Sequence, residues 1–365
     1  MHIPKIVITG GPCGGKTTAM TFLIQKLSSI GYYPIVVPEA PTILMQSGIT
    51  PVGGVFPLRV FQEHVIDLIV HLENTFHRAA VSLPHPKPIL ICDRGIMDAL
   101  AYMPEDMFWD VVRSRGLDRS SMRDARYLGI FHLRSAALGA EAFYTTANNS
   151  VRLESVDEAR IVDERTLQAW VGHPHVAIID NEGKNFDDKL GLLWKKICRV
   201  LGFPIPLEIE RKFLVEPVDL MLLGIPHQAV DIEQRYLVSP AADTVLRIRK
   251  RGQYGAYTYF ETRKQEVRPS VRVETERFIT PIEYLQFAQG QKSGTVILNK
   301  KRHCFVFKNQ YFEFDVFAAP NHGLHLLEIE LTEEQDVISL PPWIKVIRDV
   351  TDEREYSNYA LATIK

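Results

Sequence analysis

The 365-residue sequence is long for a single hydrophobic core, so two domains are expected. Apolar residues make up 46% of the chain and charged residues 24%, a composition that excludes a disordered or collagen-like protein. The 42 Lys and Arg residues nearly balance the 44 Asp and Glu residues, and the net charge of −2 excludes an overall field that would hold the chain on nucleic acid or an anionic membrane.

The cysteines and the start of the chain bear on its location. Cys13, Cys92, Cys198 and Cys304 have no paired or metal-ligand spacing, which is typical of a reduced intracellular protein. The first residues lack the features of a signal peptide, and no apolar run approaches the roughly 20 residues that span a bilayer. We therefore expect a soluble, cytoplasmic protein with no membrane partner.

The first half of the sequence alternates short apolar runs with longer helical patterns. The strands are predicted at residues 5–9, 35–37, 89–92, 127–133 and 176–180. The helices are predicted at 16–30 with Gly31 as its stop, at 57–81, from Ser155 with capping-box spacing to Glu158, and at 186–201. This alternation predicts a parallel sheet flanked by helices, in a domain that covers residues 1–203.

After Pro204 and Pro206 the pattern changes to strands with two-residue alternation. The change places the domain boundary near 203–207. Residues 207–365 therefore predict an antiparallel sheet, either closed into a barrel or folded as a sandwich.

A phosphate-binding motif lies between the first predicted strand and helix. The run GGPCGGKT at 10–17 fits G-x-x-x-x-G-K-[ST], in which backbone N–H groups and a helix N-terminus surround phosphates. Lys16 would reach the outer phosphates and Thr17 would help to hold Mg²⁺. The alternative is a glycine-rich turn with an exposed lysine. The predicted ATP-binding residues here are Gly10, Gly11, Cys13, Gly14, Gly15, Lys16, Thr17 and Thr18.

Three charged residues follow the predicted strands and would complete a phosphotransferase site. Asp93 ends a strand, where a carboxylate can orient Mg²⁺ through water, and the neighbouring Arg94 can take a phosphate or substrate oxygen. Glu39 follows the second strand and could accept a proton from a substrate hydroxyl. The alternative for each is a solvated loop charge.

Residues 1 to about 200 resemble the P-loop kinases of the AAA-type ATPase group that are related to nicotinamide riboside kinase and to the deoxynucleoside and thymidylate kinases. The resemblance rests on GGPCGGKTT, PEA and CDRG. In those enzymes a mobile lid carries arginines that close over the phosphates. The resemblance therefore implies Arg152 as an ATP-binding residue, with Arg134 as a second candidate.

The strands of the second half carry acidic and basic side chains on one face and apolar side chains on the other. In the first of them Glu208, Glu210 and Lys212 share a face. A sandwich would put the apolar faces inside and the charges in water. A barrel could instead turn the charges inward, which requires cations, metal or a polyanion to offset the buried carboxylates.

The run EIERK at 208–212 is similar to the E-x-E-x-K signature of the CYTH family, the triphosphate tunnel metalloenzymes, and the similarity extends through most of 207–360. It implies an eight-stranded antiparallel barrel whose tunnel binds a triphosphate with Mg²⁺ or Mn²⁺. The implied metal ligands are Glu208, Glu210, Glu328 and Glu330. The implied triphosphate-binding residues are Lys212, Arg247, Arg249, Lys264, Arg272, Arg302 and Arg354, and the other tunnel-lining residues are Glu274, Glu276 and Asp315. Alternation leaves open whether Lys264 or Arg263 faces inward, and the family pattern favours Lys264.

The leading hypothesis is a bifunctional phosphate-handling enzyme that has ATP and a small-molecule triphosphate as ligands. Its first domain would be a kinase with Lys16, Glu39, Asp93 and Arg94 as catalytic residues. Its second would hydrolyse a triphosphate, with Lys212 as catalytic residue. The alternatives are processing of RNA 5′ ends, which the charge balance disfavours, a nucleotide or polyphosphate sensor with one inactive domain, and a cyclase. The oligomeric state cannot be derived from these patterns.

Overall fold

The computed structural model describes residues 3–85, 87–141, 155–182, 185–204, 207–239, 241, 244–268 and 271–364. The contacts between these residues divide the chain into two compact units. The first unit is Met1–Asp118 with Arg126–Ile197, and the second is Cys198–Lys365 with the short segment Arg119–Ala125. The domain limits 1–203 and 207–365 stay a prediction. The segment Arg119–Ala125 falls within the first predicted domain but belongs to the second compact unit.

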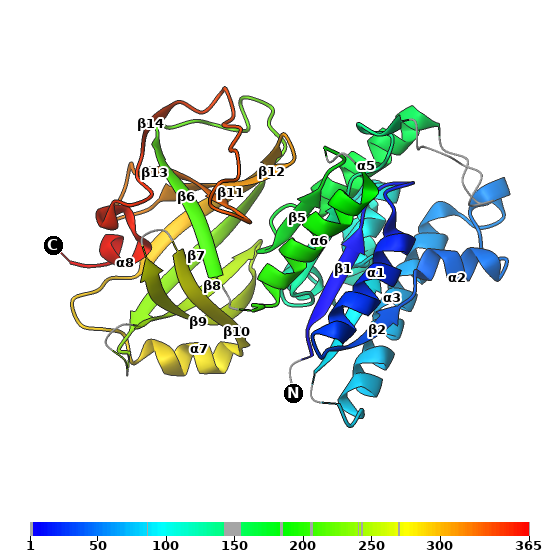
Figure 1. Ribbon diagram of the computed structural model, residues 1–365, viewed down its shortest axis with the longest axis horizontal. Coiled ribbons are helices and arrows are strands. Elements are labelled where there is room, and N and C mark those ends of the chain that lie inside the picture. Colours follow the sequence, from blue (N-terminus) through cyan, green and yellow to red (C-terminus); the bar gives the residue numbers. More distant parts are fainter. Residues whose placement is uncertain are drawn as a thin grey trace. The chain divides into compact units, whose positions relative to one another are not determined.

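The first unit is built around a five-stranded parallel sheet with the order β2-β3-β1-β4-β5 (Figure 1). Its strands are β1 (Lys5–Thr9), β2 (Tyr33–Val37), β3 (Pro88–Asp93), β4 (Gly129–Leu133) and β5 (Val176–Ile179). Its helices are α1 (Lys16–Ser29), α2 (Ala40–Gln46), α3 (Leu58–Val81), α4 (Glu105–Ser114), α5 (Val156–Trp170) and α6 (Phe186–Val200), whose end lies in the second unit. The predicted parallel sheet with flanking helices is confirmed.

Local sequence explains these elements. Strand β3, which lies between β2 and β1, is buried along its apolar run because helices cover both faces of such a sheet. Helix α1 ends where Gly31 adopts φ +84° and its N–H donates to Ser28 O at 3.1 Å. Helix α5 begins with the predicted capping box, in which Ser155 and Glu158 bond reciprocally.

The second unit is one antiparallel sheet of nine strands with the order β10-β9-β8-β7-β11-β12-β13-β6-β14. The strands are β6 (Leu207–Val215), β7 (Gln228–Leu237), β8 (Thr244–Gln253), β9 (Ala256–Arg268), β10 (Val271–Ile279), β11 (Leu298–Phe307), β12 (Gln310–Phe317), β13 (His325–Glu330) and β14 (Val346–Asp349). Its helices are α7 (Pro281–Ala288) and α8 (Asn358–Leu361), and it also contains the short helical turns η3 (Ser120–Asp124) and η5 (Arg354–Tyr356).

The predicted antiparallel sheet is confirmed, but the prediction of a closed eight-stranded barrel is wrong. The sheet has nine strands, and the seam between β10 and β6 comprises three residue pairs, from Val271↔Ile209 to Val273↔Leu207. Strands β8 and β9 pair over ten residues. The sheet therefore curls until β10 meets β6 at one end, and the barrel is not closed.

Apolar side chains of β6, β12 and β13 pack on the outer face of the curled sheet. Phe213, Phe314 and Leu327 form one cluster with Leu220 and Ile344, which come from the connecting segments. A second cluster packs α7 against neighbouring strands. The charged alternate residues of the same strands lie on the opposite face, here called the inner face. In the described ranges no helix has the length and apolar character to cross a membrane.

Candidate functional sites

The glycine-rich loop between β1 and α1 packs closely against its surroundings. A Cβ on Gly10, whose φ is +136°, would lie 2.0 Å from the carbonyl oxygen of Leu133. A Cβ on Gly15, at φ +85°, would lie 2.4 Å from the Phe186 ring. Only glycine fits these two positions, because both the space and the backbone conformation exclude a side chain.

Lys16 folds back over this loop. Its Nζ donates to the carbonyl oxygens of Gly10 and Gly11, each at 3.0 Å. Burial, followed by the charge of Arg94, lowers the pKa of Lys16 to about 8. Thr17 and Thr18 are exposed in the first turn of α1. The ammonium group and the start of the helix thus lie at the same loop, as phosphate binding requires.

Arg94 brings the predicted acidic residues together. Its Nε donates to Glu39 Oε1 at 2.5 Å, and its Nη1 lies 3.4 Å from Asp98 Oδ2. Burial would raise the pKa of Glu39, but Arg94 and Lys16 lower it to about 2. Burial, with the charge of Glu39, raises the pKa of Asp93. Lys16, Glu39, Asp93 and Arg94 therefore form one cluster at the carboxyl ends of β1, β2 and β3.

Asp163 of α5 supports the loop and was not among the predicted site residues. Its Oδ1 accepts hydrogen bonds from the backbone N–H groups of Gly11 and Ser135, both at 2.9 Å. Burial would raise its pKa, but His132 and Arg134 hold the pKa of Asp163 well below its usual range. Arg134 donates to Asp163 Oδ2 at 2.8 Å and is 7% exposed, so its assignment to a lid is corrected. Arg152 lies outside the described residues.

The inner face of the second unit carries buried ion pairs that cross between strands. Lys264 Nζ of β9 lies 2.6 Å from Glu208 of β6 and 2.7 Å from Glu274 of β10. Arg247 of β8 lies 3.3 Å from Glu274. Arg249 lies 2.7 Å from Glu276. Strands far apart in sequence thus turn opposite charges toward one another.

A second group of ion pairs lies on the neighbouring part of the same face. Lys212 Nζ is 3.0 Å from Glu328 and 3.6 Å from Glu210. Arg302 contacts Glu328 at 2.6 Å and Asp315 at 2.7 Å. Burial would raise the pKa of Glu328, but Lys212, Lys300 and Arg302 hold it well below its usual range. The predicted Lys212, Arg302, Asp315 and Glu328 are thereby brought together.

Three inner-face residues were absent from the predicted set. Lys300 is buried and lies 2.5 Å from Asp315. Glu313 is ion-paired with Arg302. Arg251 is 2% exposed and follows Arg247 and Arg249 in the alternation of β8. Alternation alone could have indicated each of them.

Three predicted residues are placed differently from the rest. The side chain of Glu330 is 50% exposed at the end of β13 and lies 3.3 Å from Arg199. Arg354 is exposed in η5. Arg272 pairs through its backbone with Glu208, and its side chain lies outside the description.

The donor groups fit hard divalent cations such as Mg²⁺ or Mn²⁺. Oδ1 of Asp93 is buried and accepts no hydrogen bond among the described residues, whereas Oε1 of Glu328 lies 3.0 Å from Lys212 Nζ. Within that part of the chain, no group of three or more His, Cys, Asp or Glu side chains is positioned to hold a metal ion. The predicted ligands Glu208, Glu210, Glu328 and Glu330 are each paired with a cation instead.

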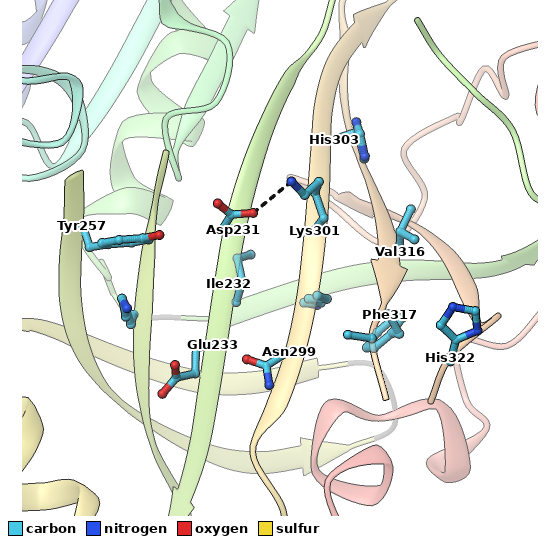
Figure 2. Close-up of a pocket in the computed structure, with 13 residues that line it drawn as sticks. Asp231, Ile232, Glu233, Tyr257, Asn299, Lys301, His303, Val316, Phe317 and His322 are labelled. Carbon is cyan, nitrogen blue, oxygen red and sulfur yellow. Dashed lines mark ion pairs between the residues drawn. The ribbon is translucent and has the colours of Figure 1, made fainter. Parts of the chain in front are cut away.

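A separate hollow of about 520 Å³ lies on the outer side of β7, β8, β11 and β12 (Figure 2). Asp231 and Lys301 face each other there at 3.2 Å, and His303 lies farther along the same strand as Lys301. These residues alternate with the inner-face residues Lys300 and Arg302. Lys300 also borders the hollow, which therefore reaches the edge of the ion-paired inner face.

Both halves of the chain match families of known proteins. The family model described as an AAA domain matches residues 5–187, and the one described as a CYTH domain matches residues 206–356. An inorganic triphosphatase of Nitrosomonas europaea is 35% identical over 160 residues, which are 42% of this chain and 96% of that protein. An inorganic triphosphatase of Acetivibrio thermocellus is 39% identical over 62 residues, which are 17% of this chain and 38% of that protein.

A crystal structure of an inorganic triphosphatase is 33% identical and covers 42% of this chain and 93% of its own, with a TM-score of 0.31. The AAA model covers half of the sequence, and the Nitrosomonas relative is matched over almost its whole length. The chain therefore belongs to the AAA domain family in its first half and to the CYTH domain family in its second.

Proposed function

We propose that the CYTH half hydrolyses a triphosphate, inorganic or organic, with Mg²⁺ or Mn²⁺ bound. The proposal rests chiefly on the charge balance of the inner face. Of the side chains described there, seven are cations and seven are carboxylates. The cations are Lys212, Arg247, Arg249, Arg251, Lys264, Lys300 and Arg302, and the carboxylates are Glu208, Glu210, Glu274, Glu276, Glu313, Asp315 and Glu328.

This balance favours a polyanion that arrives with metal. The face is close to neutral, so a triphosphate alone would leave buried negative charge uncompensated. The names of the two bacterial relatives support the same substrate class. A bound divalent ion would neutralise phosphate oxygens and polarise the attacking water.

The residues of the inner face would then exchange partners. Lys212, Arg247, Arg249, Lys264 and Arg302 would turn from carboxylates to phosphate oxygens, and Arg272 and Arg354 are further proposed contacts. Glu208, Glu210 and Glu328 would be released to hold metal, and Glu330 lies at the end of the same row. Glu274, Glu276 and Asp315 would keep the cations oriented. Lys212 would stabilise charge on the phosphate that is attacked.

The test is release of phosphate from tripolyphosphate with Mg²⁺ or Mn²⁺. We expect Lys212→Ala to lower kcat/KM by roughly a hundredfold or more, as loss of a transition-state contact does. Lys16→Ala is the matched control, because it removes a buried lysine from the other unit, and it should keep wild-type hydrolysis. Equal rates for Lys212→Ala and the wild type, with both folded, would contradict the proposal.

We propose as a second function that the AAA half is a kinase that transfers the γ-phosphoryl of ATP to a small nucleoside-like or nucleotide-like acceptor. The cluster of Lys16, Glu39, Asp93 and Arg94 supports it. Lys16 and Thr17 would hold the phosphates and Mg²⁺, with Arg152 as a proposed lid residue. Asp93 would orient Mg²⁺, and Arg94 would bind a phosphate or acceptor oxygen. With a pKa of about 2, Glu39 is ionised and suits orientation of the acceptor hydroxyl.

Two experiments test this second proposal. One is titration with Mg²⁺·ATP, and the other is an assay of ADP release with a panel of nucleosides and nucleotides. Lys16→Ala should weaken ATP binding by roughly tenfold or more, because it removes a charge-assisted contact to the phosphates. Lys212→Ala now serves as the control and should bind as the wild type does. Acceptor-independent ADP release in every reaction would speak for an ATPase and against a kinase.

A further inference from the structure

The segment Arg119–Ala125 comes from the first half of the sequence but belongs to the second compact unit. Its π-helical turn η3 contacts β8 and β9. Arg123 and Asp124 are 0% and 1% exposed. Burying two charges so fully in a short connection requires specific partners.

Those partners lie at one end of β8. Asp124 Oδ2 is 3.3 Å from Nη1 of Arg251, and Asp124 Oδ1 accepts from Nε of Arg123 at 2.7 Å. Arg123 also donates to Gln253 Oε1 at 2.9 Å. Arg119, at the start of the segment, donates to Gln228 Oε1 at 2.6 Å and stacks on the Tyr254 ring. The segment is thus anchored at several points.

Arg251 is the third arginine of a row. Arg247, Arg249 and Arg251 share the inner face of β8, and successive members are about 6.6 Å apart along the strand. The first two pair with glutamates of β10, whereas Arg251 pairs with Asp124. The arginine nearest η3 is therefore paired with a carboxylate of η3 and not with a glutamate of β10.

Acidic side chains around the row are partly exposed, including Glu313 at 20%, whereas Arg251 and Asp124 are almost fully buried. The side chains of Glu208, Glu210 and Glu274 retain 19% exposure each. The side chains of Arg251 and Asp124 retain 2% and 1%. A ligand that enters from the glutamate side meets Arg247 and Arg249 and then a position whose arginine is already neutralised.

Resting on triphosphate hydrolysis as the function of this site, we propose that Asp124 limits the length of the phosphate chain that the inner face accepts. Its carboxylate occupies Arg251 in place of a further phosphate, and η3 fills the space beyond. The site then takes three phosphates and excludes longer linear polyphosphate. Asp124 acts through Arg251 and is a specificity-determining residue without contact to the reacting phosphorus.

The experiment compares tripolyphosphate with linear polyphosphate of about 15 phosphates, by hydrolysis and by calorimetric titration, in the wild type and in Asp124→Asn. The asparagine keeps the size of the side chain but removes the carboxylate charge that Asp124 presents to Arg251. We expect the ratio of kcat/KM for the long chain to that for tripolyphosphate to rise about tenfold, chiefly through KM. Asp110→Asn, at an exposed ion-paired aspartate of α4, is the matched control and should keep the wild-type ratio.

A second variant covers the case in which Asp124→Asn does not fold. Arg119→Ala removes the anchor to Gln228 and Tyr254 but leaves Asp124 in place, and it should shift the ratio in the same direction. An unchanged ratio in a folded variant overturns the length limit. A wild type that binds both chains equally also overturns it. A wild type that binds tripolyphosphate selectively but never hydrolyses it contradicts the proposed function alone, because the titration still reports length selection.

Discussion

Single charged residues of the inner face depend on one another. Glu328 is 5% exposed and lies against both Lys212 and Arg302. Removing one partner of a buried ion pair costs about 3–5 kcal/mol, because the other charge remains buried and unpaired. Loss of activity in a Lys212 variant therefore reports on chemistry only when the variant's fold is measured alongside it.

A single histidine should make stability depend on pH. His303 is half-buried on the outer face of β11, and its ring centroid lies 5.0 Å from that of His227. Burial, followed by the charges of His227 and Lys301, lowers the pKa of His303 from 6.5 to about 4. The charges of Asp315 and Asp219 act in the opposite direction. Between pH 6.5 and about 4, His303 is protonated in the unfolded chain but stays neutral in the folded chain. The free energy of unfolding should therefore fall as pH falls from about 6.5 toward about 4.

His303→Phe keeps an aromatic ring and removes the titrating group. We expect urea unfolding of this variant to lose less stability on acidification than the wild type does. Measurement at about pH 8, where His303 is neutral in both states, gives the baseline for the substitution itself. Parallel pH profiles for the two proteins would contradict the assignment.

Residue patterns predicted much of the inner face because strand alternation has a fixed period. The sequence left open whether Lys264 or Arg263 faces inward. The structure places Lys264 against Glu208, whereas the side chain of Arg263 is 61% exposed. Asp163 and Asp124 could not be found in this way, since their partners Gly11 and Arg251 lie far from them in the sequence.

Among the elements, α7 covers the outer face beside β7, β8 and β9. Its Tyr284 packs with Leu237, Ile248 and Ile279. The helix is short and begins with a capping box between Thr280 and Glu283. A helix of eight residues has little stability of its own, so its cap and its packing must hold it in place.

Thr280→Ala removes the side-chain oxygen that accepts from the N–H of Glu283. We expect it to lower the free energy of unfolding by about 1 kcal/mol in urea denaturation. Thr21→Ala, at an exposed position inside α1, is the control and should cause no loss, since alanine is the better helix former there. A Thr280 variant as stable as the wild type would mean that packing alone holds α7.

Sequence patterns missed α2, α4 and α7 for related reasons. Helix α2 has seven residues with a proline in its first turn, α4 begins after Pro104 without a side-chain cap, and α7 lies in a region that reads as strands. The incomplete seam between β10 and β6 was also beyond prediction. Alternation fixes which face a residue occupies but carries no information on how far two edges pair.

At the scale of the whole molecule, one chain holds two clusters of opposed charges that suit phosphate chains. One is built on a glycine-rich loop, where backbone groups and a helix start face the ligand. The other is built on strand faces, where side chains alone supply the charges. Their sequence signatures differ accordingly: a compact motif at 10–17 in the first case and a pattern spread over residues 208–330 in the second.

The segment Arg119–Ala125 has a consequence for synthesis. It leaves the ribosome well before residues 198–364, which supply the rest of its compact unit. Met122 and Arg123 are both 0% exposed in the finished protein. They therefore lack the strands of their own compact unit until those strands have been translated. A nascent chain paused after α6 carries this unprotected turn, a natural place for a chaperone to hold or a protease to cut.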